Sequence, residues 1–188
     1  QKVVNTFRIR LLIQLSKKNG DIDVASQFAT VVGAPAKYPI MTSATDNLQY
    51  TFLSPTNYYP QTPDNFGQNG SRQNTSATYI GLLTGLKDPR VFVTAEPARY
   101  NVDNLKESPT AFSSFIGADP GLDLGVMYNN AGLQKYSFLN RKRYYLTYTG
   151  EPAIQVGYAE LMFNIAEGIN RGWATGNAED YYIKGIQT

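Results

Sequence analysis

The chain has 188 residues, the size of one domain, and its 17 basic and 15 acidic residues leave a net charge of +2. An aromatic content of 13% favours a folded core over disorder, and there is neither cysteine nor histidine. These features exclude disulfides and any thiol- or histidine-based catalysis within the chain, and the small charge gives no strong attraction to nucleic acid or anionic membranes.

The first thirty residues predict two helices. Apolar residues recur at helical spacing and form the expected buried face of the first: Val4, Phe7, Leu11, Leu12 and Leu15. No capping residue precedes Lys2, so we expect this helix to start before the chain does. A second helix is expected from Asp21 or Asp23, one of which would cap it, to about Val32.

The segment 33–76 predicts a long loop. Five prolines alternate there with Asn, Gln, Ser and Thr, and proline removes a backbone donor and fixes φ. Loops of this length are functional or disordered, and the recurring aromatic residues favour an ordered one: Tyr38, Tyr50, Phe52, Tyr58, Tyr59 and Phe66.

The middle of the chain predicts short elements. Ser76 to Leu86 is expected to be a helix, and Val91-Phe92-Val93 a strand. Residues 98–135 are glycine-rich and predicted to be irregular, whereas residues 136–149 carry several tyrosines and have strand propensity.

The last forty residues predict a helical hairpin. Pro152 suits a first helical turn, the following residues keep one face apolar, and Gly172, Gly176 and Asn177 interrupt the pattern before a second helix. A hairpin of this kind needs partner helices to bury both faces. We therefore expect a mainly α fold, a tetratricopeptide-like helical scaffold with long irregular loops and a few short strands.

The hairpin also resembles the C-terminal signature of the SusD/RagB family of Bacteroidetes. The matching positions keep the order and spacing of that signature: Tyr158-Ala159-Glu160, Phe163, Ala166-Glu167, Gly172, Tyr181-Tyr182 and Gly185-Ile186. Shorter upstream pieces are similar too: residues 7–11 with Leu15-Ser16, residues 38–41, and Asp88-Pro89-Arg90. The resemblance covers most of the chain, and residues 1–188 are expected to be the C-terminal part of one SusD-like domain. Within it, 1–32 would be helices, 33–149 long loops with short elements, and 150–188 the hairpin.

The resemblance implies a binding protein of the outer membrane rather than an enzyme. Such a protein would be lipid-anchored at the cell surface through a cysteine upstream of this chain. It would capture oligosaccharides, or peptides in some members, and deliver them to a SusC-like TonB-dependent transporter. No cofactor, metal or nucleic-acid partner is implied. A helical scaffold that binds only protein partners is the alternative.

Candidate ligand-binding residues come from chemistry and not from the family. Sugars offer C–H faces to aromatic planes and hydroxyl groups to amides or arginine, so we select five residues of the long loop: Asn57, Tyr58, Tyr59, Phe66 and Arg72. The same tyrosines could instead fold inward and anchor the loop.

Other residues are expected to be structural. Trp173 should pack at the hairpin turn, and Asp88-Pro89-Arg90 should anchor a loop. Residues 141–143, Arg-Lys-Arg, should form a solvated strand face.

Two groups of carboxylates invite a chemical interpretation. Asp119 and Asp123 lack the spacing of a calcium loop and fit a turn. Glu160 and Glu167 lie seven residues apart, about 10 Å along a helix, too far for a retaining glycosidase though within reach of an inverting one. The hairpin explains their positions better.

Overall fold

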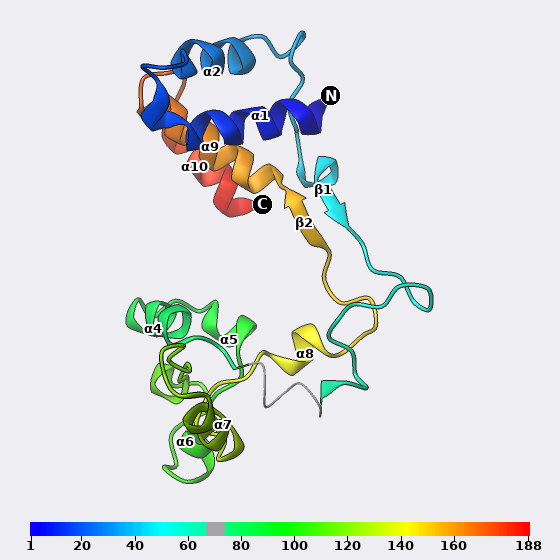
Figure 1. The fold of residues 1–188 in the computed structure, drawn as a ribbon, viewed down its shortest axis with the longest axis vertical. Coiled ribbons are helices and arrows are strands. Elements are labelled where there is room, and N and C mark those ends of the chain that lie inside the picture. The colour runs from blue at the N-terminus through cyan, green and yellow to red at the C-terminus, as the bar shows by residue number, and fades with distance from the viewer. Residues whose placement is uncertain (67–73) are drawn as a thin grey trace. The chain divides into compact units, whose positions relative to one another are not determined.

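The computed structural model describes residues 1–66 and 74–188, which form two compact units: Gln1–Tyr50 with Pro152–Thr188, and Thr51–Glu151. Helices make up most of the regular structure, which confirms the mainly α prediction (Figure 1). Among the described helices, none has the length and apolarity needed to cross a bilayer. The placement of this chain as the C-terminal part of a single domain remains a prediction.

The first unit is a helical layer with a small sheet. Its elements are α1 (Lys2–Gln14), α2 (Val24–Gly33), β1 (Leu48–Tyr50), β2 (Ala153–Val156), α9 (Tyr158–Asn170) and α10 (Ala178–Gln187), with 3₁₀ turns at Ser16–Lys18 and Ala44–Asp46. The helix α9 lies beside α1 and α10 (Figure 1). Its buried side packs with α1 and α2 in one core, whose largest fully buried side chains include Ile9, Phe28, Leu161 and Ile165.

The helical hairpin is confirmed. The Asn177 side chain accepts a hydrogen bond from the Glu179 N–H at 3.1 Å and so caps α10. Close contact between α9 and α10 depends on Gly185, because a Cβ there would lie 2.7 Å from the ring of Phe163. The second predicted helix is also confirmed as α2, with Asp23 as its cap, accepting from the Ser26 N–H at 3.1 Å.

The predicted buried face of α1 is wrong. Val4, Phe7, Leu11 and Leu15 are 69%, 42%, 40% and 38% exposed, and of the predicted face only Leu12 is buried. The side that packs on α2 and α9 carries Thr6, Ile9 and Leu12. Because α1 has apolar residues on more than one side, spacing alone could not select the face. The polar Thr6 is accommodated because its hydroxyl accepts a hydrogen bond from the Met41 N–H at 3.2 Å.

The chain after Pro152 is a strand rather than a first helical turn. Residues Ala153–Val156 form β2, which pairs antiparallel with β1, and α9 begins only at Tyr158. The register joins Tyr50 to Ala153 and Leu48 to Val156. Pairing across about a hundred residues of sequence overrides the local signal for a helix start.

The second unit consists of short helices and ordered loops. Its helices are α4 (Ala77–Gly85), α5 (Val91–Thr94), α6 (Arg99–Asp103), α7 (Leu124–Gly132) and α8 (Arg141–Tyr144), with a 3₁₀ turn at Phe112–Ser114. The expected helix after Ser76 is confirmed as α4, and Ser76 caps it by accepting from the Tyr79 N–H at 3.1 Å.

Three local predictions for this unit are wrong. Residues 91–93 are helical in α5, because the turn at Asp88-Pro89 starts a helical chain of hydrogen bonds, the first from the Val91 N–H to the Asp88 carbonyl at 3.2 Å. The segment 98–135 contains α6 and α7. Residues 136–149 form no strand, and α8 begins there instead because the Asn140 side chain accepts from the Arg143 N–H at 3.3 Å.

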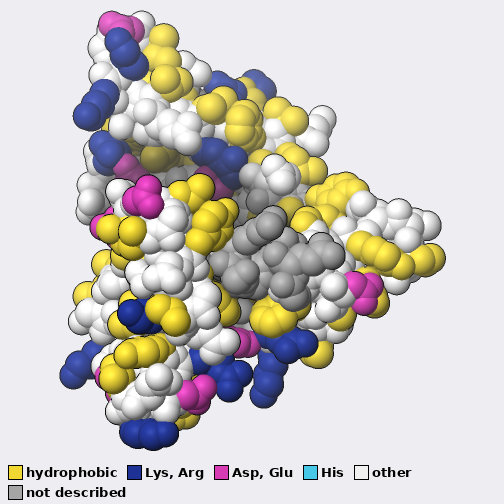
Figure 2. Space-filling view, turned by 60° about the horizontal axis from the view of Figure 1, so that its bottom comes forward, with side chains coloured by type: hydrophobic (Ala, Val, Ile, Leu, Met, Phe, Trp, Pro, Cys, Tyr) yellow, Lys and Arg dark blue, Asp and Glu magenta, His cyan; other side chains and the backbone are white. Residues whose placement is uncertain are grey.

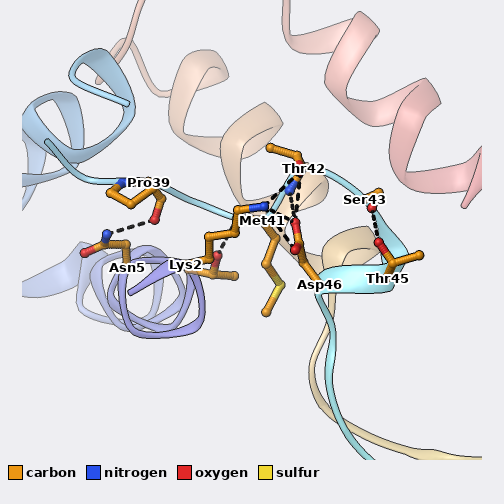
Figure 3. Close-up of polar contacts among 9 residues, drawn as sticks. Lys2, Asn5, Pro39, Met41, Thr42, Ser43, Thr45 and Asp46 are labelled. Atoms are coloured by element: carbon orange, nitrogen blue, oxygen red, sulfur yellow. Dashed lines mark hydrogen bonds and ion pairs between the residues drawn. The ribbon is translucent and has the colours of Figure 1, made fainter. Parts of the chain in front are cut away.

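A polar cluster joins the start of α1 to the segment before β1 (Figure 3). The Lys2 ammonium donates to both carboxylate oxygens of Asp46, at 3.0 and 2.8 Å. The backbone N–H and the hydroxyl of Thr42 donate to the same carboxylate at 2.8 and 2.9 Å. Hydrogen bonding to Lys2, more than any other contact, lowers the pKa of Asp46 to about 2.

The depressed pKa of Asp46 predicts a pH-dependent contribution to stability. A carboxyl with a lowered folded-state pKa stabilises the fold above its unfolded value of 3.8, and the stabilisation is lost as pH falls through about 2. We expect Asp46→Asn to lower the melting temperature at pH 7. Near pH 2 the melting temperatures of the variant and the unsubstituted protein should approach each other. Melting curves between pH 7 and pH 2 measure this, and a constant difference across that range would contradict it.

The packing of Gly168 predicts a strong effect of adding one methyl group. A Cβ at this position would lie 2.2 Å from the ring of Phe28, which is fully buried and has no room to move. We expect Gly168→Ala to destabilise the protein by about 1–3 kcal/mol through overpacking. Urea unfolding measures the loss. In α4, Gly81→Ala is the matched control, since a Cβ there meets nothing within 4 Å, and equal effects of the two changes would contradict the prediction.

Candidate functional site

The loop that carries the predicted ligand-binding residues is held by local hydrogen bonds. Leu53 and Asn57 exchange two backbone hydrogen bonds of 2.7 Å each, which closes a tight turn. Farther along, the Asn65 side chain accepts from the Thr62 N–H at 3.0 Å and donates to the Pro60 carbonyl at 2.7 Å. These contacts satisfy backbone groups that the prolines leave without regular partners, so residues 53–65 are held in a defined conformation.

Three pairs of aromatic rings converge on this loop and form what we call the aromatic cluster: Phe52, Tyr58, Tyr59, Phe66, Tyr145 and Tyr148. Tyr58 faces Tyr148 with ring centroids 4.7 Å apart and an interplanar angle of 40°. The rings of Phe52 and Tyr59 meet edge to face at 5.1 Å, and those of Phe66 and Tyr145 at 5.0 Å. Contacts of this geometry add to the burial of the rings and fix their planes.

Tyr59 joins the loop to the chain that follows α8. Its backbone N–H donates to the Tyr148 carbonyl at 2.7 Å. Its ring covers Gly150, whose φ of +48° and lack of a side chain allow the contact. Burial, more than the nearby charge of Glu151, raises the pKa of the Tyr59 phenol. Tyr59 is therefore an anchoring residue.

Tyr58 differs from Tyr59 because its side chain reaches solvent. It is 45% exposed, and Tyr148 supports it from one side. The Tyr148 hydroxyl donates to an Asp64 carboxylate oxygen at 2.9 Å, and this hydrogen bond raises the pKa of Tyr148. The cluster therefore offers one exposed ring backed by a second ring whose orientation is fixed.

Two arginines of α8 lie against aromatic rings of this region. The Arg141 guanidinium carbon is 4.3 Å from the centroid of Phe66. Arg143 lies over Tyr144 at 5.2 Å and forms a bidentate ion pair with Glu151, one of whose contacts, Nη2 to Oε2, is 2.9 Å. The hydrogen bond to Glu151 raises the pKa of the Arg143 guanidinium.

The structure brings four of the five predicted site residues into one region. Tyr58, Tyr59 and Phe66 belong to the aromatic cluster, and Asn57 closes the turn directly before it. Arg72 lies outside the described residues. Tyr59 packs inward and anchors the loop, whereas Tyr58 stays exposed; ligand binding by these residues remains a prediction.

Sequence reasoning missed the partners on the other segment. Tyr145, Tyr148 and Arg141 lie in the stretch predicted as a strand, and the strand prediction hid their role. The available signal was the density of tyrosines directly after three basic residues. Their pairing with the loop depends on contacts about eighty residues apart.

The second unit also contains a pocket of about 410 Å³ that the sequence did not suggest. Its wall is mainly apolar, with Phe92, Phe115, Ala95, Pro97 and Pro109, and its polar residues are Glu96, Thr110, Asn140 and Lys142. The Asn140 amide is engaged, because it donates to the Phe92 carbonyl at 3.1 Å and caps α8. Apolar walls with a few polar groups are typical of small-ligand sites.

The residues expected to be structural have structural contacts. Trp173 meets the edge of Phe28 at 5.7 Å within the core of the first unit. Asp88 accepts from the Arg90 backbone N–H at 2.9 Å and pairs with its guanidinium. The basic run 141–143 is exposed as expected, but on the helix α8 and not on a strand.

The carboxylates considered for metal binding or catalysis are also engaged. Asp119 accepts from the Gly121 N–H at 2.9 Å in a turn, and Asp123 caps α7. Within residues 1–66 and 74–188 there is no group of three or more side chains suited to hold a metal ion. Glu160 pairs with Arg10, and Glu167 accepts from the Arg171 guanidinium at 2.8 Å.

Comparison with known proteins finds a family model and several solved structures that the chain is similar to. A family model described as SusD-like, starch-binding and associating with the outer membrane matches residues 1–188. A SusD homologue from Bacteroides fragilis is 32% identical in sequence and superimposes with a TM-score of 0.84. The match covers 99% of this chain and 39% of the homologue. A second solved structure, from Bacteroides vulgatus, is described as an outer-membrane protein involved in nutrient binding. It is 34% identical, with a TM-score of 0.77, and the match covers 98% of this chain and 40% of that protein.

A chitin-binding protein shares the fold, with 23% sequence identity and a TM-score of 0.69. The match covers 99% of this chain and 38% of that protein. No curated protein sequence matches. The chain thus spans about two fifths of the length of these solved structures.

The contact between Tyr59 and Gly150 predicts that a side chain added at residue 150 disrupts the packing of the aromatic cluster. In Gly150→Ala the new Cβ would lie 2.2 Å from the Tyr59 ring, and φ is +48°. We expect a loss of about 1–3 kcal/mol in stability and displacement of Tyr59. Urea unfolding and the tyrosine signals in near-ultraviolet circular dichroism measure both. Gly132→Ala is the control, because its Cβ has open space; unchanged spectra for Gly150→Ala would contradict the prediction.

Proposed function

Because the chain belongs to the SusD-like family of starch-binding, outer-membrane-associated proteins, we propose that it binds oligosaccharides at the cell surface through the aromatic cluster. The bound glycan would pass to a SusC-like TonB-dependent transporter. A lipid anchor on the complete protein would hold it at the outer membrane. The transporter and the anchor rest on the family resemblance alone.

The observation that carries the proposal is the exposed face of Tyr58 supported by Tyr148. The tyrosine is 45% exposed although its ring is fixed by a neighbour 4.7 Å away. An aromatic plane held in place before the ligand arrives loses little side-chain entropy on binding. The C–H face of a pyranose ring can cover such a plane, while its hydroxyl groups bond to polar groups nearby.

Polar groups for those hydroxyls lie beside the tyrosines. The Asp64 carboxylate accepts a hydrogen bond from the Tyr148 hydroxyl, and a carboxylate can accept several. The Arg141 guanidinium, held over Phe66, retains donors at its edge. An aromatic plane with flanking donors and acceptors is the combination that we expect for a sugar.

The proposed role is binding without chemistry. The two carboxylates that suggested a glycosidase, Glu160 and Glu167, each form an ion pair with an arginine. A pair of carboxyl groups that act as acid and base would need different pKa values. Reducing-end release by the purified protein would contradict a purely binding role.

A helical scaffold for protein partners is the second candidate. It is favoured by the exposed apolar residues of α1, among which Val4 is 69% exposed. The two functions make opposite predictions for small ligands, because a scaffold that binds only proteins has no affinity for oligosaccharides. The peptide-binding alternative within the family is tested by including oligopeptides in the same panel.

We expect Tyr58→Ala to weaken glycan binding about tenfold or more, since it removes the exposed stacking plane, worth about 0.5–1.5 kcal/mol beyond its buried area. Its melting temperature should fall only slightly, because the side chain is half exposed and the stabilising contact it loses is the ring pair with Tyr148. Isothermal titration against neutral and acidic oligosaccharides and oligopeptides measures the affinities.

Tyr128→Ala serves as the control, since Tyr128 lies on α7 outside the cluster and is 52% exposed. Equal affinities of Tyr58→Ala and the unsubstituted protein would remove the aromatic cluster as the site. Failure of the intact protein to bind any oligosaccharide would overturn the proposed function.

A further inference from the structure

The three consecutive basic residues of α8 differ in how their charges are balanced. Arg143 forms a bidentate ion pair with Glu151. Arg141 and Lys142 are exposed, and neither makes an ion pair with any residue in the described parts of the chain. This short helix therefore presents two exposed cations without an ion-pair partner in the described parts of the chain, and one of them, Arg141, lies against the aromatic cluster.

The position of Arg141 is fixed, although no residue among 1–66 and 74–188 forms an ion pair with it. Its backbone N–H donates to an oxygen of Glu96 at 2.8 Å, and its guanidinium lies 4.3 Å from the centroid of Phe66. Phe66 is in turn held edge to face by Tyr145 at 5.0 Å. Contact with a ring occupies the face of a guanidinium and leaves the N–H groups at its edge available, which is the geometry that binds an anionic oxygen pair.

Of the carboxylates near this helix, Glu151 forms the ion pair with Arg143. Asp64 and Glu96 accept hydrogen bonds from neutral donors, the Tyr148 hydroxyl at 2.9 Å and the Arg141 backbone N–H at 2.8 Å. On the face shown in Figure 2, basic side chains occur in several separate places and not in one continuous patch. The attraction for an anion therefore depends on the placement of the Arg141 donors and not on the net charge of the chain.

We infer that the oligosaccharide bound at the aromatic cluster is acidic, with a carboxylate or sulfate group that binds the Arg141 guanidinium. This inference rests on the proposed function and names the class of glycan. Tyr58 contacts the C–H face of a sugar ring, and Arg141 binds the anionic group. Lys142, the next residue on α8, strengthens the local positive potential. A neutral glycan would gain the stacking contact and lose the ionic one.

The test is titration calorimetry of the intact protein with oligosaccharides of equal length. One neutral series, one uronate series and one sulfated series separate the two sources of charge. We expect at least one acidic series to bind about tenfold more tightly than the neutral series, the usual gain from a charge-assisted hydrogen bond pair. Raising the salt concentration should weaken acidic binding and leave neutral binding unchanged.

Variants at Arg141 test the residue itself. We expect Arg141→Gln to lose most of the preference for acidic glycans, because the acidic series loses the charge-assisted contact whereas the neutral series loses only weaker hydrogen bonds to hydroxyl groups. Arg141→Lys should recover part of that preference, because it restores the charge without the planar pair of donors. Arg99→Gln is the matched control, since it removes the same charge from an arginine that Asp103 already balances at 3.3 Å.

Two outcomes would overturn the inference. The first is equal affinity for the neutral and acidic series. The second is an Arg141→Gln variant that keeps the melting temperature of the unsubstituted protein and still prefers acidic glycans. If neutral glycans bind through Tyr58 without an acidic preference, only this inference fails. If no oligosaccharide binds, the proposed function fails with it.

Discussion

The pairing of β1 with β2 is the constraint on which the candidate site depends. It places Tyr50 opposite Ala153, so the two ends of the segment 51–151 are held side by side. Both segments that build the aromatic cluster, residues 52–66 and 141–151, lie near these ends in sequence. Closing a segment of about a hundred residues costs entropy that grows only slowly with its length, and a few backbone hydrogen bonds suffice to keep it closed. The fixed ends allow two distant loop segments to meet at Tyr59 and Tyr148.

The site shows how an irregular chain becomes rigid without sheets or long helices. Asn65 and Asn140 bond to backbone groups that no regular structure satisfies, and the rings of Tyr58, Tyr148 and Phe66 pack in pairs. Each contact is small, about 0.5–1.5 kcal/mol for a hydrogen bond or a ring pair, but each orders only a few residues. A surface assembled in this way can vary its side chains without a change in the helical scaffold.

Particular residues show how far sequence reasoning reached at the site. The aromatic and amide residues of the loop were found because their side-chain chemistry is visible without a fold, and four of the five selected lie together. The opposite segment was missed because Tyr145 and Tyr148 have strand propensity, while the cap at Asn140 and the ring contacts with the loop decide its conformation. The difference between Tyr58 and Tyr59 was also invisible, since adjacent identical residues carry no information on which one covers Gly150.

By itself the sequence determined the helical hairpin, the capped helix α2, the mainly α fold and the family, because helix caps, glycine breaks and apolar spacing act over a few residues. It left open which side of α1 is buried, since that helix has apolar residues on several sides and only contact with α2 and α9 selects Ile9 over Val4. The tertiary structure alone decided that residues 153–156 form a strand, that residues 141–144 form a helix, and that Arg141 lies over Phe66. For the strand and for Arg141 the partner lies far away along the chain, and local propensity is weaker than the pairing or contact that the partner provides. At 141–144 the local cap of Asn140 acts together with the bond from its amide to the distant Phe92 carbonyl.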